Sequence, residues 1–296
     1  MLLIGAFFFI FLRKNYMTKN LFYLLPIFII LFSCRNSDNE SDIKAEQEFL
    51  VKKINPLFSP EGHMMLPPNS ETKKHFEFEY DSKNRLTKRI GLIIPSAGPF
   101  YGFTDKIATI IEYNNSSASI KNIAIIPDYP IIDIKEDFKF NNENQIIEKY
   151  IPAKYSNRMD KKIKYLYDGK VLIKRETTYP NRSYDPSLSW DYIETIVEDF
   201  IYNSNNNLQK IVTTSHKTGN VNSITKTKEI TFDDYDTSKN PFVKLGILND
   251  YFERSLSKNN FRSRSEISYN IDGTPRDKSE NTWVFMYNTK GDLIIE

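Results

Sequence analysis

Side chains that commonly catalyse reactions or bind metals are few in this sequence and lie far apart. The three histidines are His63, His75 and His216, and their spacing matches no zinc or iron ligand set. The chain contains no HExxH segment, phosphate-binding loop or nucleophile elbow. We therefore expect a protein that is not an enzyme and that uses no cofactor and no metal.

Acidic residues are the remaining candidates for chemistry. Asp233, Asp234 and Asp236 lie close together, but the glycine-containing loop of known calcium motifs is missing, so a solvated turn is the better interpretation. With 38 acidic residues, some pair of neighbouring carboxylates is inevitable in any fold. An envelope hydrolase is therefore retained only as a third, less favoured class.

The single cysteine, Cys34, follows a segment typical of protein export. Thr18-Lys19-Asn20 is a short positive region, and Leu21 to Phe32 is an apolar run too short to span a membrane comfortably. Leu31-Phe32-Ser33-Cys34 resembles the lipobox of bacterial lipoproteins, and this resemblance implies that Cys34 is lipidated and becomes the mature N-terminus. The alternative is an uncleaved anchor with an ordinary buried cysteine.

These signals divide the chain into three parts. Residues 1–33 are the expected signal peptide, with translation starting at Met17, and residues 34–48 are an acidic tether before a single domain at 49–296. The tether is either a plain spacer or a sorting signal, because its acids resemble those of Bacteroidetes lipoproteins. That resemblance implies the outer membrane, at its periplasmic face or on the cell surface.

Charge and cysteine content exclude two further classes. After removal of residues 1–33 the net charge is −1, so no basic field attracts nucleic acid. One cysteine permits no internal disulfide framework. The sequence does not indicate an oligomeric state.

One polar insertion contains large aromatic side chains. Tyr179 and Tyr192 flank it, and Tyr184 and Trp190 lie within it. Binding residues are common on loops held by a rigid scaffold, so we expect these four residues to contact a protein or glycan ligand. The alternative is that the loop folds back and caps the sheet.

The element that must position this loop is a recurring β-hairpin. In Phe76 to Tyr80, aromatic residues alternate with glutamates, as expected for a strand with one buried face. Asp81 to Asn84 supply a turn, and Leu86 to Ile90 form the return strand. A further strand is expected at Phe49 to Ile54.

Weaker copies of this pattern continue to the C-terminus. They occupy residues 107–113, 134–140, 163–167, 196–202, 230–232, 267–269 and 283–287. Leu86, Ile146, Leu208 and Leu293 each follow a strand-ending aromatic by six positions. The common phase predicts that the strand-ending residues are largely buried on one face, namely Tyr80, Phe140, Tyr167, Tyr202, Tyr269 and Tyr287.

The hairpin also carries a family resemblance. Glu79 to Lys88 resembles the YD repeat of Rhs-type proteins, and 49–296 resembles YD-repeat-bearing lipoproteins of Bacteroidetes. The resemblance implies a repetitive β-sheet at the cell envelope and implies no activity. Phe242, Leu245, Leu248, Phe252 and Leu256 recur at helical spacing after Pro241, which predicts a helix that starts there and covers one end or edge of the sheet.

The sequence thus predicts an all-β fold, a large twisted antiparallel β-meander of successive YD-type hairpins with one short helix near 241–256. The favoured function is a lipid-anchored envelope module that binds an unknown ligand. The alternative is a carrier of an apolar or lipid ligand in the periplasm or outer membrane. A filled core favours the module, whereas an apolar cavity of several hundred Å³ favours the carrier.

Overall fold

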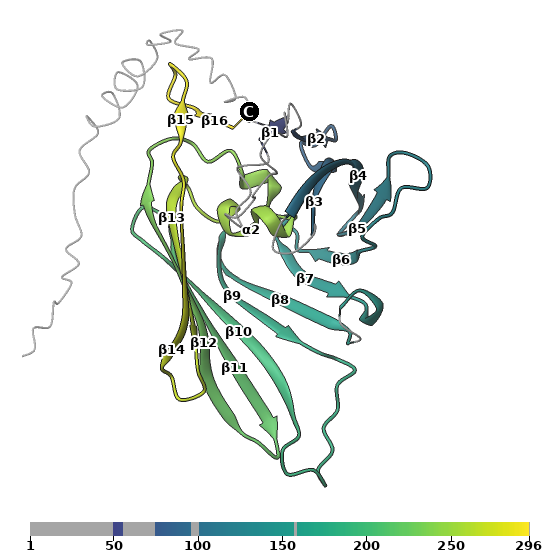
Figure 1. Ribbon diagram of the computed structural model, residues 1–296, viewed down its shortest axis with the longest axis vertical. Helices are drawn as coiled ribbons and strands as arrows, with labels where there is room; N and C mark the ends of the chain where they lie inside the picture. Colours follow the sequence, from purple (N-terminus) through teal and green to yellow (C-terminus); the bar gives the residue numbers. More distant parts are fainter. Residues whose placement is uncertain (1–49, 56–74, 96–100, 157–158, 296) are drawn as a thin grey trace, which may run out of the picture. The chain divides into compact units, whose positions relative to one another are not determined.

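The computed structural model describes residues 50–55, 75–95, 101–156 and 159–295, all within the unit Phe49–Glu296. It confirms the predicted all-β meander (Figure 1). Fourteen strands form one antiparallel sheet in which each strand pairs with its sequence neighbours, and two short strands form a second sheet.

The strands of the large sheet follow one another with few interruptions. They are β1 (Lys53–Ile54), β2 (Phe76–Tyr80), β3 (Leu86–Pro95), β4 (Tyr101–Asn114), β5 (Ser117–Ala124), β6 (Lys135–Phe140), β7 (Ile146–Ile151), β8 (Lys161–Asp168), β9 (Val171–Thr178), β10 (Tyr192–Tyr202), β11 (Leu208–Gly219), β12 (Ser223–Tyr235), β13 (Phe261–Tyr269) and β14 (Pro275–Thr282). The small sheet contains β15 (Met286–Tyr287) and β16 (Leu293–Ile294). The helical elements are η2 (Ala153–Tyr155), η3 (Val243–Leu245) and α2 (Asn249–Ser255).

Five hairpins share the same turn. In each, the strand-ending aromatic pairs with the residue six positions later, as in Tyr80 with Leu86 and Tyr287 with Leu293. The residue four positions after the aromatic has a left-handed backbone, with φ between 58° and 83°. Asparagine and glycine tolerate this conformation better than other residues. These positions are Asn84, Asn144, Asn206, Gly273 and Gly291.

The residue directly after the aromatic stabilises the turn. Asp81 Oδ1 accepts hydrogen bonds from the backbone N–H groups of Lys83 and Arg85, both at 2.9 Å. Asn141, Asn203 and Asn288 accept the corresponding pairs of bonds in three other hairpins. An Asp or Asn after the aromatic therefore satisfies turn amides that the β-ladder leaves unpaired.

The predicted burial of the strand-ending aromatics is wrong in degree. Tyr80, Phe140, Tyr167, Tyr202 and Tyr269 are only half-buried, and Tyr287 is 36% exposed. They lie beside the turns at the sheet margin, where Tyr80 Oη donates to Val51 O at 2.8 Å. The fully buried residues come two and four positions earlier, such as Phe76 and Phe78.

The segment after Asn240 is helical in two short pieces, and the α-helix begins at Asn249 rather than at Pro241. Leu248 has an extended backbone and separates η3 from α2. The two pieces approach so closely that a Cβ on Gly246 would lie 2.9 Å from Ser255 Cβ. A continuous helix could not bring both pieces together in this way.

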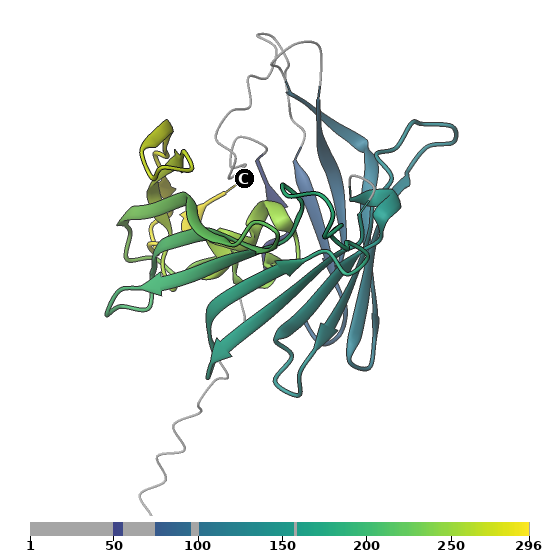
Figure 2. The ribbon, with the colours of Figure 1, turned by 90° about the horizontal axis from the view of Figure 1, so that it is seen from below.

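The helix α2 covers a face of the sheet and not an edge (Figure 2). Asp250 pairs with Arg89 on β3 at 2.5 Å, and Glu253 pairs with Arg264 on β13 at 2.9 Å. Ten strand spacings would separate β3 and β13 by about 48 Å in a flat sheet, whereas seven helical residues extend only about 10 Å. The sheet must therefore curve around α2.

Two groups of buried side chains lie on this inner face. One contains Phe76, Phe78, Leu245 and Tyr251, and the other lies over β8 to β13 and contains Phe200 and other residues. Phe252 and Leu256 pack against the second group. Side chains from both halves of the sheet thus pack against α2.

Arg254 is the largest fully buried side chain in the described residues, with 1% exposure. Its guanidinium lies 4.1 Å from the ring centroid of Phe261 and 4.4 Å from that of Trp283. Burial lowers the pKa of this group, but arginine keeps its charge in proteins, so the ring faces hold a cation.

Two predicted strands differ from the structure. The strand expected at Phe49 to Ile54 is limited to β1, with Phe49 outside the described residues. The strand expected at 283–287 is interrupted, because β14 ends at Thr282 and only Met286–Tyr287 is β15. Trp283 N–H still donates to Arg262 O of β13 at 2.9 Å, and its ring packs against Phe261 and the Arg254 cation.

The shared turn can be tested in one hairpin. Asn144→Ala places a Cβ-bearing residue without a local polar group at φ 60°, and we expect a loss of about 1–2 kcal/mol in unfolding free energy. Asn144→Gly should retain or raise stability. Urea denaturation measures both effects.

Asn142→Ala is the matched control, because Asn142 lies in the same turn, is also exposed and lacks a positive φ. We expect a change within about 0.5 kcal/mol there. Equal losses at both positions would contradict the assigned turn geometry.

Candidate functional site

The predicted ligand-contact loop connects β9 to β10 and is exposed from Pro180 to Trp190. It has internal order, because Leu188 N–H donates to Asp185 O at 3.1 Å and Asp191 N–H donates to Leu188 O at 2.9 Å. Two successive turns thus shape the loop before β10 begins.

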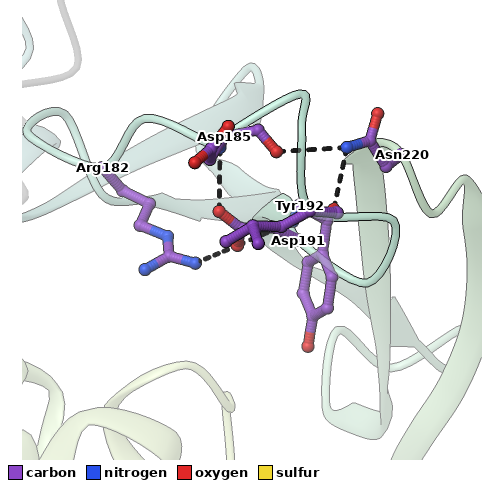
Figure 3. Close-up of polar contacts among 6 residues, drawn as sticks. Arg182, Asp185, Asp191, Tyr192 and Asn220 are labelled. Carbon is purple, nitrogen blue, oxygen red and sulfur yellow. Dashed lines mark hydrogen bonds and ion pairs between the residues drawn. The ribbon is translucent and has the colours of Figure 1, made fainter.

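Asp191 holds these turns together (Figure 3). Its side chain is buried, with Oδ1 accepting from Arg182 Nη2 at 2.5 Å and Oδ2 accepting from Asp185 N–H at 2.9 Å. The bond from Asp185 N–H, followed by the bond from Tyr192 N–H and the Arg182 charge, holds the pKa of Asp191 below its ordinary value. One carboxylate therefore fixes both ends of the loop.

The connection between β11 and β12 also supports the loop through hydrogen bonds. Asn220, between β11 and β12, donates through Nδ2 to Asp185 O at 3.1 Å and to Leu188 O at 2.9 Å. A Cβ on Gly219 would lie 3.2 Å from the Tyr184 ring, so glycine permits close packing there. The loop is docked on the β11–β12 turn.

The structure brings only some of the predicted contact residues together. Tyr184 and Tyr192 both adjoin Gly219, and Lys217 Nζ lies 4.3 Å above the Tyr192 ring. Tyr179 and Tyr192 are half-buried, whereas Tyr184 is 38% and Trp190 66% exposed. Trp190 therefore does not cap the sheet, contrary to the alternative expectation.

Sequence reasoning missed the residues that order this loop. Asp191 and Asn220 are separated by 28 intervening residues, and no local pattern predicts that they share a turn network. The available signal was weak, namely an aspartate directly before Tyr192, the aromatic residue that ends the polar insertion. Cys34, the predicted lipidation site, lies outside the described residues.

A second group of polar residues lines the sheet face beneath α2. Lys149 Nζ lies 2.7 Å from Glu136 Oε2 and donates to Asn249 Oδ1 at 2.9 Å. Burial lowers the pKa of Lys149, and the Glu136 charge opposes this effect. Across the same face, Arg175 forms a bidentate pair with Glu198 at 2.5 and 2.7 Å.

The sequence pattern indicates which glutamates point inward. Glu136 and Glu198 occupy the same phase as the inward Phe138 and Phe200 on their strands. A charged residue in a buried row requires a partner, because an unpaired buried charge is strongly unfavourable. Single-strand patterns did not identify the partners, since each lies on another strand.

A cavity of about 730 Å³ lies between these strands and α2. Its lining includes Lys161, Arg175, Glu198, Lys228, Glu253 and Arg264, together with Phe252 and threonine side chains. The cavity is large enough for a small molecule, and its wall combines these charged groups with apolar side chains such as Ile163 and Ile211.

The other candidates from the sequence are engaged in local contacts. Asp234 pairs with Arg262 at 2.6 Å, and Asp236 accepts from Asn260 N–H at 3.0 Å. His216 Nε2 contacts Thr214 Oγ1 at 3.0 Å, and His63 lies outside the described residues. Within the described ranges, no group of three or more His, Cys, Asp or Glu is arranged to hold a metal.

No helix in the described part of the chain has the length and apolar character needed to cross a membrane. No family model matches the chain, and no curated protein matches it.

Two similar solved structures are porin-like proteins. The one from Bacteroides uniformis is 10% identical, with a TM-score of 0.42 over 74% of this chain and 80% of that chain. The one from Bacteroides vulgatus is 11% identical, with a TM-score of 0.39 over 77% of this chain and 95% of that chain. These scores are too low to support an inference about function.

We expect the ordered loop to loosen in acid. Because the pKa of Asp191 is lower in the folded protein than in the unfolded chain, its contribution to stability is full above about pH 4 and is lost as the pH falls further. Bonds from Ser187 also lower the pKa of Asp185, which acts in the same direction. Trp190 fluorescence anisotropy in a Trp283→Phe background follows the change.

The Asp191→Asn variant should have low Trp190 anisotropy already at neutral pH and a smaller acid transition. Asp168→Asn, at the exposed end of β8, is the control and should behave like the parent. An unchanged transition in Asp191→Asn would remove Asp191 from its assigned role.

Proposed function

We propose that the protein is a lipid-anchored binding module of the bacterial cell envelope that contacts a protein or glycan through the Tyr179–Tyr192 loop. One observation carries this proposal: Trp190 is 66% exposed on a loop fixed by the Asp191 network. The function proposed is binding without catalysis.

Exposure of Trp190 has an energetic reason to matter for binding. When a partner covers a large aromatic side chain that was in water, the burial of its apolar surface stabilises the complex. Tryptophan is accordingly enriched at the hot spots of interfaces. The turns that hold the loop reduce the conformational entropy lost on binding. Tyr184, packed beside Gly219, is a second exposed aromatic side chain on the same loop.

The main cavity favours this module over the apolar carrier. A lipid carrier requires an apolar interior, whereas in the cavity of about 730 Å³ the apolar side chains are interspersed with charged ones such as Arg175 and Glu198. A more apolar hollow beside Phe140, Tyr167 and Leu256 has a volume of about 290 Å³, small for a lipid-sized ligand.

The envelope location rests on the N-terminal sequence. Cys34 ends an export segment, and the acidic tether 34–48 resembles sorting signals that imply the outer membrane, at its periplasmic face or on the cell surface. Four matching hairpin turns support the resemblance to YD-repeat lipoproteins, because Asp81, Asn141, Asn203 and Asn288 perform one structural role.

The anchor is tested by Cys34→Ser. Serine has no thiol to carry the acyl chains that hold a lipoprotein stably on a membrane. The variant should therefore remain unprocessed by the lipoprotein pathway and show altered electrophoretic mobility. Labelling with a radioactive or alkyne-tagged fatty acid should mark the parent chain alone. Equal labelling of the parent and Cys34→Ser would refute lipidation at this residue.

The contact loop is tested by Trp190→Ala. We expect binding to isolated envelope fractions or arrayed glycans to weaken by about tenfold or more, corresponding to roughly 1.4 kcal/mol or more, with little change in melting temperature. Surface plasmon resonance and thermal unfolding provide the two readouts.

Ile271→Ala is the matched control, since Ile271 is another apolar side chain with 84% exposure but lies on the β13–β14 turn. It should bind like the parent. Parent-like binding by Trp190→Ala, or absence of binding by the parent to every protein and glycan tested, would count against the proposed contact.

A further inference from the structure

We propose that the cavity beneath α2 binds an acidic sugar, a hydroxyl-rich molecule that bears a carboxylate or phosphate. This site is separate from the aromatic loop and does not depend on the function proposed for it. Its volume of about 730 Å³ is within the range of small-molecule sites.

The positive charges of the cavity wall are unevenly neutralised. Arg175 is paired with Glu198 at 2.5 Å, and Arg264 with Glu253 at 2.9 Å and Glu266 at 2.8 Å. Lys161 and Lys228 also line the cavity, and neither has a carboxylate within 4.0 Å among the described residues. Two ammonium groups are therefore available to an anion.

A buried hydroxyl lies beside one of these lysines. Thr213 on β11 is directly opposite Lys228 on β12 in the sheet register, and both side chains line the cavity. Thr213 is 6% exposed, and its Oγ1 has no hydrogen-bond partner among the described residues. Buried hydroxyls are normally paired, so this one marks a place for a ligand oxygen.

The rest of the wall suits a molecule with several hydroxyls. Thr177 and Asn281 are buried polar residues that line the same cavity, and the paired carboxylates Glu198 and Glu253 retain further acceptor capacity. Hydroxyl groups both donate and accept, as this mixture of groups requires. Phe252 also lines the cavity and adds apolar surface for the less polar side of a sugar.

Binding by the full chain is measured calorimetrically with glucuronate, glucose 6-phosphate, inorganic phosphate and glucose. We expect at least one acidic sugar to bind at least about tenfold more tightly than neutral glucose, with affinity that falls as salt rises. Preference for glucuronate or for the phosphate ester identifies the anionic group. Tightest binding of inorganic phosphate would overturn the sugar assignment.

Lys228→Gln and Lys161→Gln should each weaken that binding by about tenfold. Lys164→Gln is the matched control, because Lys164 is on the same strand as Lys161 but is exposed on the opposite face. Equal effects of Lys164→Gln and Lys228→Gln, equal affinity for glucose, or no binding at millimolar concentration would each overturn the proposal.

Thr213→Val separates binding from folding. Removal of an unpartnered buried hydroxyl at nearly constant shape should leave the melting temperature unchanged or higher. The same change should weaken binding of the acidic sugar. If Thr213→Val folds well and binds the acidic sugar as tightly as the parent, Thr213 does not belong to the site. If Lys228→Gln also binds as tightly as the parent, the cavity is not the binding site.

Discussion

The contact between α2 and strands from both halves of the sheet determines the curvature on which the interior depends. Arg89 on β3 and Arg264 on β13 reach carboxylates on the same seven-residue helix. These contacts are largely polar and are accompanied by Tyr251 and Phe252, which pack against different groups of buried residues. The helix therefore joins two half-cores, and the cavity lies where α2 faces the strands between them.

Charges inside the curved sheet are held in two different ways. Arg175 and Glu198 satisfy one another, as do Lys149 and Glu136, so these groups remain buried without an unpaired charge. The Arg254 cation is held differently, by aromatic faces and by one bond from Nη1 to Phe261 O at 3.1 Å. The Trp283 ring belongs to the same arrangement, since it completes the surroundings of the guanidinium.

Local patterns in the sequence predict the hairpins well because each hairpin is determined by neighbouring residues. Leu86, Ile146, Leu208 and Leu293 all begin strands, as their phase relative to the preceding aromatic indicates. The aromatic loop was likewise located, but its organiser Asp191 was not, because its partners include a distant β-turn. The start of α2 and the cavity also depend on distant contacts, such as Asp250 with Arg89, that no periodicity within one segment encodes.

The last strand of the large sheet has a different consequence. Among the described residues β14 pairs only with β13, so its other side is an edge with unpaired peptide groups. Such an edge can recruit a strand from another molecule and start aggregation. Seven of the eight β14 residues are exposed, the strand begins with Pro275, and charges occur from Arg276 to Glu280. Proline and desolvation of these charges oppose the addition of a foreign strand, so the sequence of β14 protects a long meander from intermolecular sheet growth.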